Sequence, residues 1–375
     1  MKQSKMVFLG DYIEQSDLRN SDGILGEDKV RGLSTAKGMT PTKANLDGVL
    51  LNSYKVVLPD EIAFVPDTSR RGDKMSLGKN NTEENLLVSS ISCVIRVKDK
   101  NTLNPDFLYL MFCRPEFDRY ARFHSWGSAR EAFTYEDMCR VQIPLPPIEE
   151  QQKVVNSWKA FREIKEQNEA IAAPLMQVCQ SYIQELKQKY ESVEIGSYIE
   201  EANEKNSDDI YGASSVRGLA TSKGMIETKA NMDGVSVSTY KIVKPGEIAF
   251  VPDTSRRGDK MSLGYNESKE SVLVSSISCV IRIKDEEKLS PQFLYLWYCR
   301  PEFDRYARFH SWGSAREAFT YNDMQRVRIP LPPIDVQRAI VNIYNCANEA
   351  KRIAEEADRK SREVCPALIQ HIIHS

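Results

Sequence analysis

Two short segments of the chain carry residue types that suit contact with DNA. The first is Asp67–Lys74 (DTSRRGDK), and the second is Arg119–Arg130 (RYARFHSWGSAR). An arginine can donate two hydrogen bonds to O6 and N7 of guanine, a contact that discriminates by ~1–3 kcal/mol. Hydroxyl and lysine side chains can hold phosphates, and a Trp or His ring can stack on an extruded base. A solvated loop with surface ion pairs remains the other interpretation of both segments.

The candidate DNA-contacting residues share cationic, hydroxyl or aromatic side chains and occur as two matching sets. Secondary candidates, for phosphate contact, are Lys37, Lys43, Lys223 and Lys229. Arg119 ranks below Arg122 and Arg130 because it can pair with Glu116 or Asp118. The two sets are Ser69, Arg70, Arg71, Lys74, Arg122, His124, Trp126, Ser128 and Arg130, and Ser255, Arg256, Arg257, Lys260, Arg308, His310, Trp312, Ser314 and Arg316.

The two sets match because the chain contains one module twice, at a constant shift of 186 residues. From residue 31 to residue 147, about three quarters of the positions are identical in the second copy, which is typical of a duplication. Both candidate segments are unchanged between the copies, whereas Leu50–Ser53 and Asn80–Asn85 differ from their counterparts. Functional constraint would produce this pattern, and so would recent gene conversion.

Composition allows two ordinary domains and excludes a membrane protein. The chain has 375 residues, 41% of them hydrophobic, and no apolar run approaches the ~18–20 residues of a membrane span. The first residues lack the apolar core of a signal peptide, so we expect a cytoplasmic protein. Eight scattered cysteines show no zinc-site spacing and are expected to be reduced. The net charge of −2 does not indicate a nucleic-acid binder, so any DNA contact must come from local clusters.

Each module reads as a mixture of strands and helices. Asn104-Pro105 offers an N-cap followed by proline at the first helical position, and Ser290-Pro291 repeats the signal. The β-branched run Leu86–Lys98 predicts one long buried strand. The other predicted elements are two short strands in Tyr54–Val65, helices at Phe107–Cys113 and Glu116–Phe123, a short helix capped by Thr134, and a strand at Val141–Ile143.

A proline-rich elbow, Ile-Pro-Leu-Pro-Pro-Ile, and a helix follow each module. The elbows are Ile143–Ile148 and Ile329–Ile334, and we expect them to be stiff and extended. Each helix carries an a/d stripe of the coiled-coil type, with Asn168 as a polar residue that fixes register. Pro174 and Pro366 predict kinks. The stripes are Phe161, Ile164, Asn168, Ile171, Leu175, Val178 and Tyr182 in the first helix, and Ala347, Ala350, Ala354, Ala357, Ser361, Val364 and Leu368 in the second.

One stripe is bulky and the other is mostly small, so we expect the two helices to pack on each other. The alternative is that each helix packs only on its own module. The predicted fold is α+β: two mixed α/β recognition domains separated by two long helices in an antiparallel coiled coil, with pseudo-two-fold symmetry. The predicted boundaries are 1–147 and 191–333 for the recognition domains, 148–190 for the central helix and 334–375 for the C-terminal helix.

Paired modules that each end in this elbow, an acid-x-Gln sequence and a long helix resemble the specificity subunits of Type I restriction–modification systems. The matching stretches are Ile143–Gln151 and Ile329–Gln337. Tyr54–Val57, Asp67–Lys74 and Arg114–Arg130 also resemble one subclass of the family's recognition domains. The resemblance covers essentially the whole chain.

The resemblance implies a non-catalytic subunit that binds double-stranded DNA and directs methylation of adenine N6. Two modification subunits would supply the methyltransferase, and restriction subunits would supply the translocase and nuclease. No cofactor is expected in this subunit, while S-adenosylmethionine, ATP and Mg²⁺ would act on the partners. The sequence has no Asp/Asn-Pro-Pro-Tyr/Phe stretch and no phosphate-binding G-x-x-x-x-G-K-S/T. Modules in this family usually differ, so their near identity here predicts a bipartite, roughly palindromic site.

Three other functions stay open at this point. A structural adaptor could hold two proteins through the coiled coil without sequence preference for DNA. A stand-alone nuclease could use Asp67, Asp73 or Glu131 with a metal ion. A specificity subunit within a fused Type II complex is a close variant of the leading interpretation.

Overall fold

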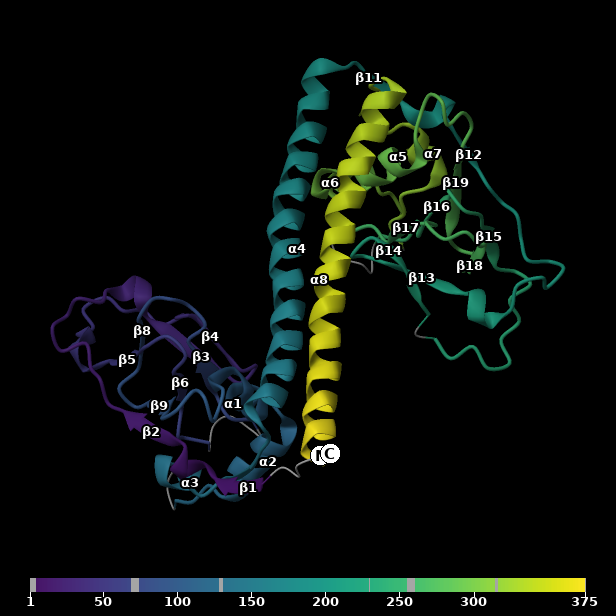
Figure 1. Ribbon diagram of the computed structural model, residues 1–375. Coiled ribbons are helices and arrows are strands. Elements are labelled where there is room, and N and C mark those ends of the chain that lie inside the picture. Colours follow the sequence, from purple (N-terminus) through teal and green to yellow (C-terminus); the bar gives the residue numbers. More distant parts are fainter. Residues whose placement is uncertain are drawn as a thin grey trace. The chain divides into compact units, whose positions relative to one another are not determined.

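The computed structural model describes residues 5–68, 74–127, 131–228, 230–254, 260–313 and 316–374. Contacts divide the chain into two compact units, of which unit 1 is Met1–Gln167 with Ile353–Ser375 and unit 2 is Asn168–Arg352. Each unit holds one copy of the module and one half of each of two long helices, α4 (Ile148–Lys189) and α8 (Ile334–His374) (Figure 1). No helix in the described part of the chain is long and apolar enough to cross a membrane.

A four-stranded antiparallel sheet and three strand pairs build the module of unit 1. The sheet has the order β2-β9-β6-β7 and buries Ile62, Phe64 and Leu77 almost completely. The sheet strands are β2 (Ile13–Ser16), β9 (Cys93–Val97), β6 (Ile62–Phe64) and β7 (Leu77–Lys79). The pairs are β1 (Lys5–Phe8) with β10 (Gln142–Leu145), β3 (Arg31–Ser34) with β4 (Gly38–Pro41), and β5 (Lys55–Val57) with β8 (Leu86–Val88).

Three helices complete this module, and local capping signals fix where they begin. They are α1 (Pro105–Phe112), α2 (Pro115–Phe123) and α3 (Tyr135–Cys139). The Asn104 side chain accepts a hydrogen bond from the backbone N–H of Asp106 at 2.8 Å, so α1 starts two residues before the predicted start at Phe107. Thr134 and Asp137 form a reciprocal capping box at α3, which confirms the predicted cap.

Unit 2 repeats the same architecture element by element. Val7 pairs with Ile143 in unit 1, and Val193 pairs with Ile329 at the same register in unit 2. The sheet strands are β12 (Ile199–Glu201), β19 (Cys279–Ile283), β16 (Ile248–Phe250) and β17 (Leu263–Tyr265). The pairs are β11 (Ser192–Glu194) with β20 (Arg328–Pro330), β13 (Arg217–Ala220) with β14 (Gly224–Glu227), and β15 (Lys241–Val243) with β18 (Val272–Val274). The helices are α5 (Pro291–Tyr298), α6 (Pro301–Phe309) and α7 (Tyr321–Gln325).

The run Leu86–Lys98 is two strands rather than the one long strand predicted from its β-branched residues. The backbone N–H of Ser92 donates to the carbonyl of Ser89 at 2.9 Å, and this turn separates β8 from β9. The two strands then join different partners, β8 pairing with β5 and β9 with β2 and β6. A turn of small residues inside an apolar run leaves the hydrophobic pattern almost unchanged, which is why the sequence conceals it.

The long helices pack on each other within each unit, as predicted. In unit 1, Val154 and Val155 of α4 share a core with Ile369 of α8, and Lys165 forms an ion pair with Asp358 at 2.8 Å. These contacts run in opposite directions along the two helices, so the packing is antiparallel. In unit 2, Cys179, Ile183 and Leu186 of α4 join Ile340 and Val341 of α8. Both cores also include the first helix of the module, α1 or α5, so the helices pack on the modules as well.

The buried face of α4 differs from the predicted stripe. Ile164, Ile171, Val178 and Tyr182 are 40–50% exposed. The buried positions near them include Cys179 and Ile183, each one residue later than the predicted Val178 and Tyr182. The face is rotated because α4 packs on two surfaces, the other helix and its module. On α8 the predicted alanines Ala347, Ala350, Ala354 and Ala357 are all buried, whereas Val364 is 36% exposed. Both helices continue through the prolines Pro174 and Pro366.

A buried glutamine explains the elbow sequence that precedes each helix. Gln151 is fully buried, and its Oε1 accepts from the backbone N–H of Asn104 at 2.8 Å. Its Nε2 donates to the carbonyls of Thr102 at 3.0 Å and Pro146 at 2.9 Å. Gln337 makes the same three contacts in unit 2. Each glutamine thus ties the first turn of a long helix to the loop before α1 or α5.

Replacing Gln151 with leucine should lower the free energy of unfolding by about 1 to 3 kcal/mol, because the buried hydrogen bond to Pro146 and two partly buried ones are lost. The measurement is urea denaturation followed by circular dichroism. The control is Gln152→Leu next to it, since Gln152 is exposed and its hydrogen bonds are at the surface. Equal effects of the two changes would contradict the assigned role of Gln151.

Cysteine reactivity should follow burial. Burial raises the pKa of Cys93 to about 12, so at pH 8 roughly one molecule in ten thousand carries the thiolate there. Cys346 is exposed on α8. Treating the native protein with iodoacetamide and mapping the labelled peptides should show modification of Cys346 well before Cys93. Labelling of Cys93 at the same rate would show that the core around β9 opens readily.

Candidate nucleic-acid interface

The structure brings the two predicted segments together in each module. In unit 1, Asp67 and Ala132 form an antiparallel bridge, and the N–H of Phe133 donates to the carbonyl of Pro66 at 2.9 Å. The backbone N–H and the hydroxyl of Thr68 both donate to the carbonyl of Glu131, at 3.0 and 3.1 Å. One end of each segment is therefore fixed to the other by backbone contacts between residues about 60 positions apart.

Unit 2 holds the same junction with the same geometry. Asp253 bridges Ala318, and the N–H and hydroxyl of Thr254 donate to the carbonyl of Glu317 at 3.0 and 3.1 Å. The N–H of Phe319 donates to the carbonyl of Pro252 at 2.9 Å. The two copies of the candidate site are thus alike in structure as well as in sequence.

The C-terminal end of α2 presents two exposed aromatic side chains beside this junction. Phe123 is 75% exposed and Trp126 is 69% exposed. Trp126 exchanges two backbone hydrogen bonds with Ala132, at 3.2 and 3.0 Å, and Gly127 follows it at a φ of 146°. That conformation suits glycine alone. The counterparts Phe309 and Trp312 are 77% and 69% exposed, so each module offers a pair of rings to solvent.

Sequence reasoning selected the tryptophans and missed Phe123 and Phe309. The available signal was their position on a short amphipathic helix. In α2 the buried face is formed by Phe117 and Ala121, and Phe123 falls off that face at the last helical residue. A large apolar side chain at such a position must point to solvent or to a partner.

His124 has internal partners instead of a free ring. Its Nδ1 lies 2.9 Å from the carbonyl of Tyr120, and the two rings stack with centroids 4.0 Å apart. Burial raises the pKa of Tyr120, and the Asp137 carboxylate adds to this shift, so the phenol stays neutral beneath the histidine. His310 lies against Tyr306 with the same distances in unit 2.

Arg122 forms an ion pair with Glu131, and Arg308 forms the same pair with Glu317. All four side chains are about two-fifths exposed. Lys74, Lys260 and Arg316 are exposed at the ends of the same segments. In each module the described residues therefore place an arginine, a carboxylate and an exposed tryptophan at the junction of the two segments. Among the described residues, no group of three or more His, Cys, Asp or Glu side chains could hold a metal ion.

Lys37 and Lys223, expected to contact phosphates, have buried internal partners. The Lys37 side chain is 9% exposed, and its Nζ donates to Asp118 Oδ1 at 2.5 Å and to the carbonyl of Met75 at 3.0 Å. The N–H of Met75 also donates to Asp118, at 2.9 Å. Lys223 repeats the arrangement with Asp304 and Met261. These lysines hold the end of the first segment against α2 or α6, and their ammonium groups do not face solvent.

Several predicted site residues lie outside the described part of the chain. They are Ser69, Arg70, Arg71, Ser128 and Arg130 of the first set, Ser255, Arg256, Arg257 and Ser314 of the second set, and the secondary candidate Lys229. Asp73, named for the nuclease alternative, lies there too. Lys43 is described and exposed.

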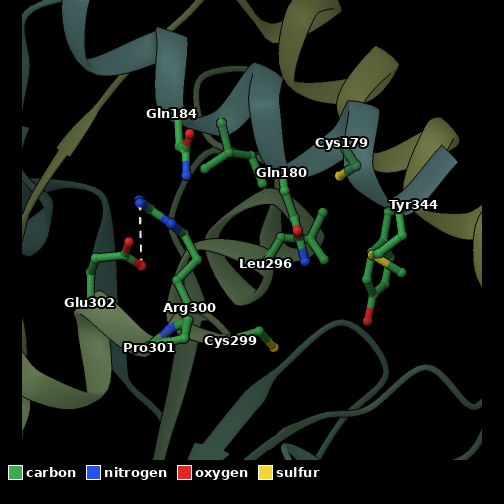
Figure 2. Close-up of a pocket in the computed structure, with 11 residues that line it drawn as sticks. Cys179, Gln180, Gln184, Leu296, Cys299, Arg300, Pro301, Glu302 and Tyr344 are labelled. Carbon is green, nitrogen blue, oxygen red and sulfur yellow. Dashed lines mark ion pairs between the residues drawn. The ribbon is translucent and has the colours of Figure 1, made fainter. Parts of the chain in front are cut away.

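Unit 2 also contains a cavity of about 330 Å³ near the start of α6 (Figure 2). In Figure 2, Gln184 of α4 extends toward Arg300, which pairs with Glu302 at 3.4 Å, and Gln180 extends toward Leu296. The Arg300 guanidinium also lies 4.4 Å from the ring centroid of Trp297. The cavity and the exposed rings are at opposite ends of α6, so the cavity does not belong to the candidate interface.

The chain belongs to the Type I restriction modification DNA specificity domain family, whose model matches residues 74–173 and 242–345. The family membership predicted from the elbow and the repeat is confirmed. Comparison with curated proteins gives no match.

Solved structures similar to this chain include an S subunit of a Type I restriction-modification system from M. genitalium. It is 11% identical, with 98% of this chain and 95% of that chain covered and a TM-score of 0.62. The HsdS subunit from Thermoanaerobacter tengcongensis is 19% identical, with 99% and 96% covered and a TM-score of 0.38. A structure described as the basis of complex assembly and conformational transition of the type I R-M system is 17% identical, with 100% and 98% covered and a TM-score of 0.42. At such identities, the first of these shows a shared fold.

Replacing Asp118 with alanine should destabilise unit 1 by about 3 to 5 kcal/mol, because it leaves the Lys37 ammonium buried without its countercharge. Urea denaturation measures the change. The matched control is Glu14→Gln, which removes a carboxylate from an exposed pair with Arg96 and should cost less than about 1 kcal/mol. If the two changes had equal effects, the Lys37–Asp118 pair would have no special structural role.

Proposed function

We propose that this chain is the sequence-reading subunit of a Type I restriction–modification complex and reads a bipartite, nearly palindromic DNA site. Its membership of the DNA specificity family supports DNA recognition. The observation that carries the two-part site is the repetition of one surface in both modules: the joined segments, the Arg–Glu pair and the two exposed rings. Two equal surfaces select equal base sequences.

Inverted half-sites are favoured over direct repeats. Two equivalent readers related by a two-fold axis meet the same bases on opposite strands of a duplex. The two long helices run antiparallel within each unit, which supports that symmetry. The proposed target is therefore one short sequence, a gap of unread bases, and the inverse complement of the first sequence.

The roles of the residues follow from their chemistry and exposure. The arginines beside the junction, Arg122 and Arg308, would donate to guanine or to a phosphate. Lys74, Lys260 and Arg316 would hold the backbone and set the register. Phe123 and Trp126, with Phe309 and Trp312, would contact thymine methyl groups or the faces of bases.

The chemistry belongs to partner subunits in this proposal. Two modification subunits would transfer methyl groups from S-adenosylmethionine to adenine N6, and restriction subunits would use ATP and Mg²⁺ to translocate and cut DNA in the cytoplasm. This chain would contribute the choice of site and no catalytic residue.

The test is enrichment of bound duplexes from a randomised library by the full chain assembled with its modification partners, together with long-read mapping of N6-methyladenine. The expected motif has two inverted halves. Arg122→Ala should relax base choice in one half-site, and Arg308→Ala should relax it in the other. Arg96→Ala, which removes an exposed arginine far from the junction in sequence, should leave the motif unchanged.

An asymmetric motif would contradict the proposal that the two modules recognise the same bases. The absence of any enriched motif would contradict the proposal that the chain recognises a DNA sequence. If Arg122→Ala weakened binding equally on all sequences, that arginine would be a phosphate contact and would read no base.

A further inference from the structure

The Arg–Glu pair beside the exposed rings contains a carboxylate at a surface proposed to meet DNA. The Glu131 side chain is 41% exposed and pairs with Arg122, which is 39% exposed. Trp126 lies next to it through the backbone bridge to Ala132. A negatively charged group therefore lies on a face that is proposed to approach the phosphates of DNA.

A carboxylate at a DNA surface gains a contact only where the duplex offers a hydrogen-bond donor. Phosphate oxygens are acceptors and repel it. In the major groove the base edges offer only the N4 amine of cytosine and the N6 amine of adenine as donors, since the guanine and thymine edges there carry acceptors. A carboxylate held at the interface therefore penalises every base except these two.

The backbone holds Glu131 at the surface. Its carbonyl accepts two hydrogen bonds from Thr68, and the next residue, Ala132, exchanges two with Trp126. These contacts fix the backbone from which the carboxylate extends, and the side chain itself is held by its pair with Arg122. Glu317 is held in the same way by Thr254.

The Arg122–Glu131 pair recurs in unit 2 as Arg308–Glu317. Two other pairs recur as well, Arg96–Glu14 as Arg282–Glu200 and Arg114–Glu116 as Arg300–Glu302, while some pairs are lost. Lys29 pairs with Glu84 in unit 1 at 2.8 Å, but Ser215 takes the position of the lysine in unit 2. An exposed ion pair contributes little to stability. The Arg122–Glu131 pair differs from the other retained pairs in its position, because it lies at the junction of the two segments next to the exposed Trp126.

We propose that Glu131 and Glu317 are specificity-determining residues, each accepting a hydrogen bond from the exocyclic amine of one cytosine or adenine in its half-site. The paired arginine then donates to an acceptor beside that amine. On other sequences the carboxylate finds no donor and weakens binding. This inference rests on the proposed function. It adds to the proposed interface a residue that disfavours binding to incorrect bases.

The test compares Glu131→Gln and Glu317→Gln in the full chain with its modification partners. Glutamine has nearly the same shape but no charge, and its amide both donates and accepts. Each variant should admit guanine or thymine at one position of one half-site in the randomised library. Binding to a duplex without the site should rise, so that the ratio of specific to non-specific binding falls about ten-fold.

A shorter carboxylate provides a second variant. Glu131→Asp should keep the preference for a base with an exocyclic amine, because aspartate retains the carboxylate. It should weaken binding to the correct site, because the shorter side chain holds the carboxylate farther from the base. The control is Glu14→Gln, which removes a carboxylate from another exposed pair with arginine and should change neither the motif nor the non-specific binding. Urea denaturation of each variant establishes that it is folded.

The outcomes separate the two proposals. If the wild-type complex enriches no motif, the proposed function fails, and this inference fails with it. If the wild-type complex enriches a motif and Glu131→Gln leaves both the motif and the selectivity ratio unchanged, the function stands and the carboxylate is no selector. A relaxed position occupied by cytosine or by adenine in the wild-type motif identifies which amine is read.

Discussion

A buried charge pair is the constraint on which the candidate interface of each module depends. Lys37 reaches from the turn of the β3–β4 hairpin to Asp118 in α2, and both hold the backbone of Met75 at the end of the first segment. Three parts of the chain are thereby fixed at one point. The far end of α2 then carries Arg122 and Phe123 in set positions, and Trp126 follows three residues later at the junction. A buried ion pair is weak evidence for net stability, but breaking it is costly. Its main effect is therefore to fix the relative positions of these three parts of the chain.

Much of the fold follows from local signals in the sequence. Asn104 and Thr134 cap helices as expected, and the duplication predicts that the second unit repeats the first. Contacts between distant residues carry no such signal. The bridge between Asp67 and Ala132 brings the two segments together, and no periodicity in either segment indicates it. The same applies to Lys37, since its sequence neighbours resemble those of any exposed lysine while its partner lies 81 residues away.

The candidate site was predictable in composition but not in arrangement. The sequence identifies cationic and aromatic residues, whereas the exposure of Phe123 and the pairing of Arg122 depend on how α2 is oriented. The helix stripe was predictable on α8, where alanines leave one buried face. The stripe was not predictable on α4, because α4 packs on both the other helix and its module, so its buried positions do not follow one stripe. The structural role of the glutamine that follows each elbow was also not evident from the sequence. Gln151 and Gln337 are buried, and each makes hydrogen bonds to three backbone groups.

The register shared by the two terminal strand pairs has a consequence for how the protein reaches its native state. Val7 closes module 1 against Ile143, and Val193 closes module 2 against Ile329 in an equivalent ladder. A strand exchanged between modules would therefore find nearly native partners. Adjacent repeats of such similarity are prone to domain-swapped traps during folding. Synthesis from the N-terminus counters this hazard, because β1 and β10 can pair before β20 leaves the ribosome.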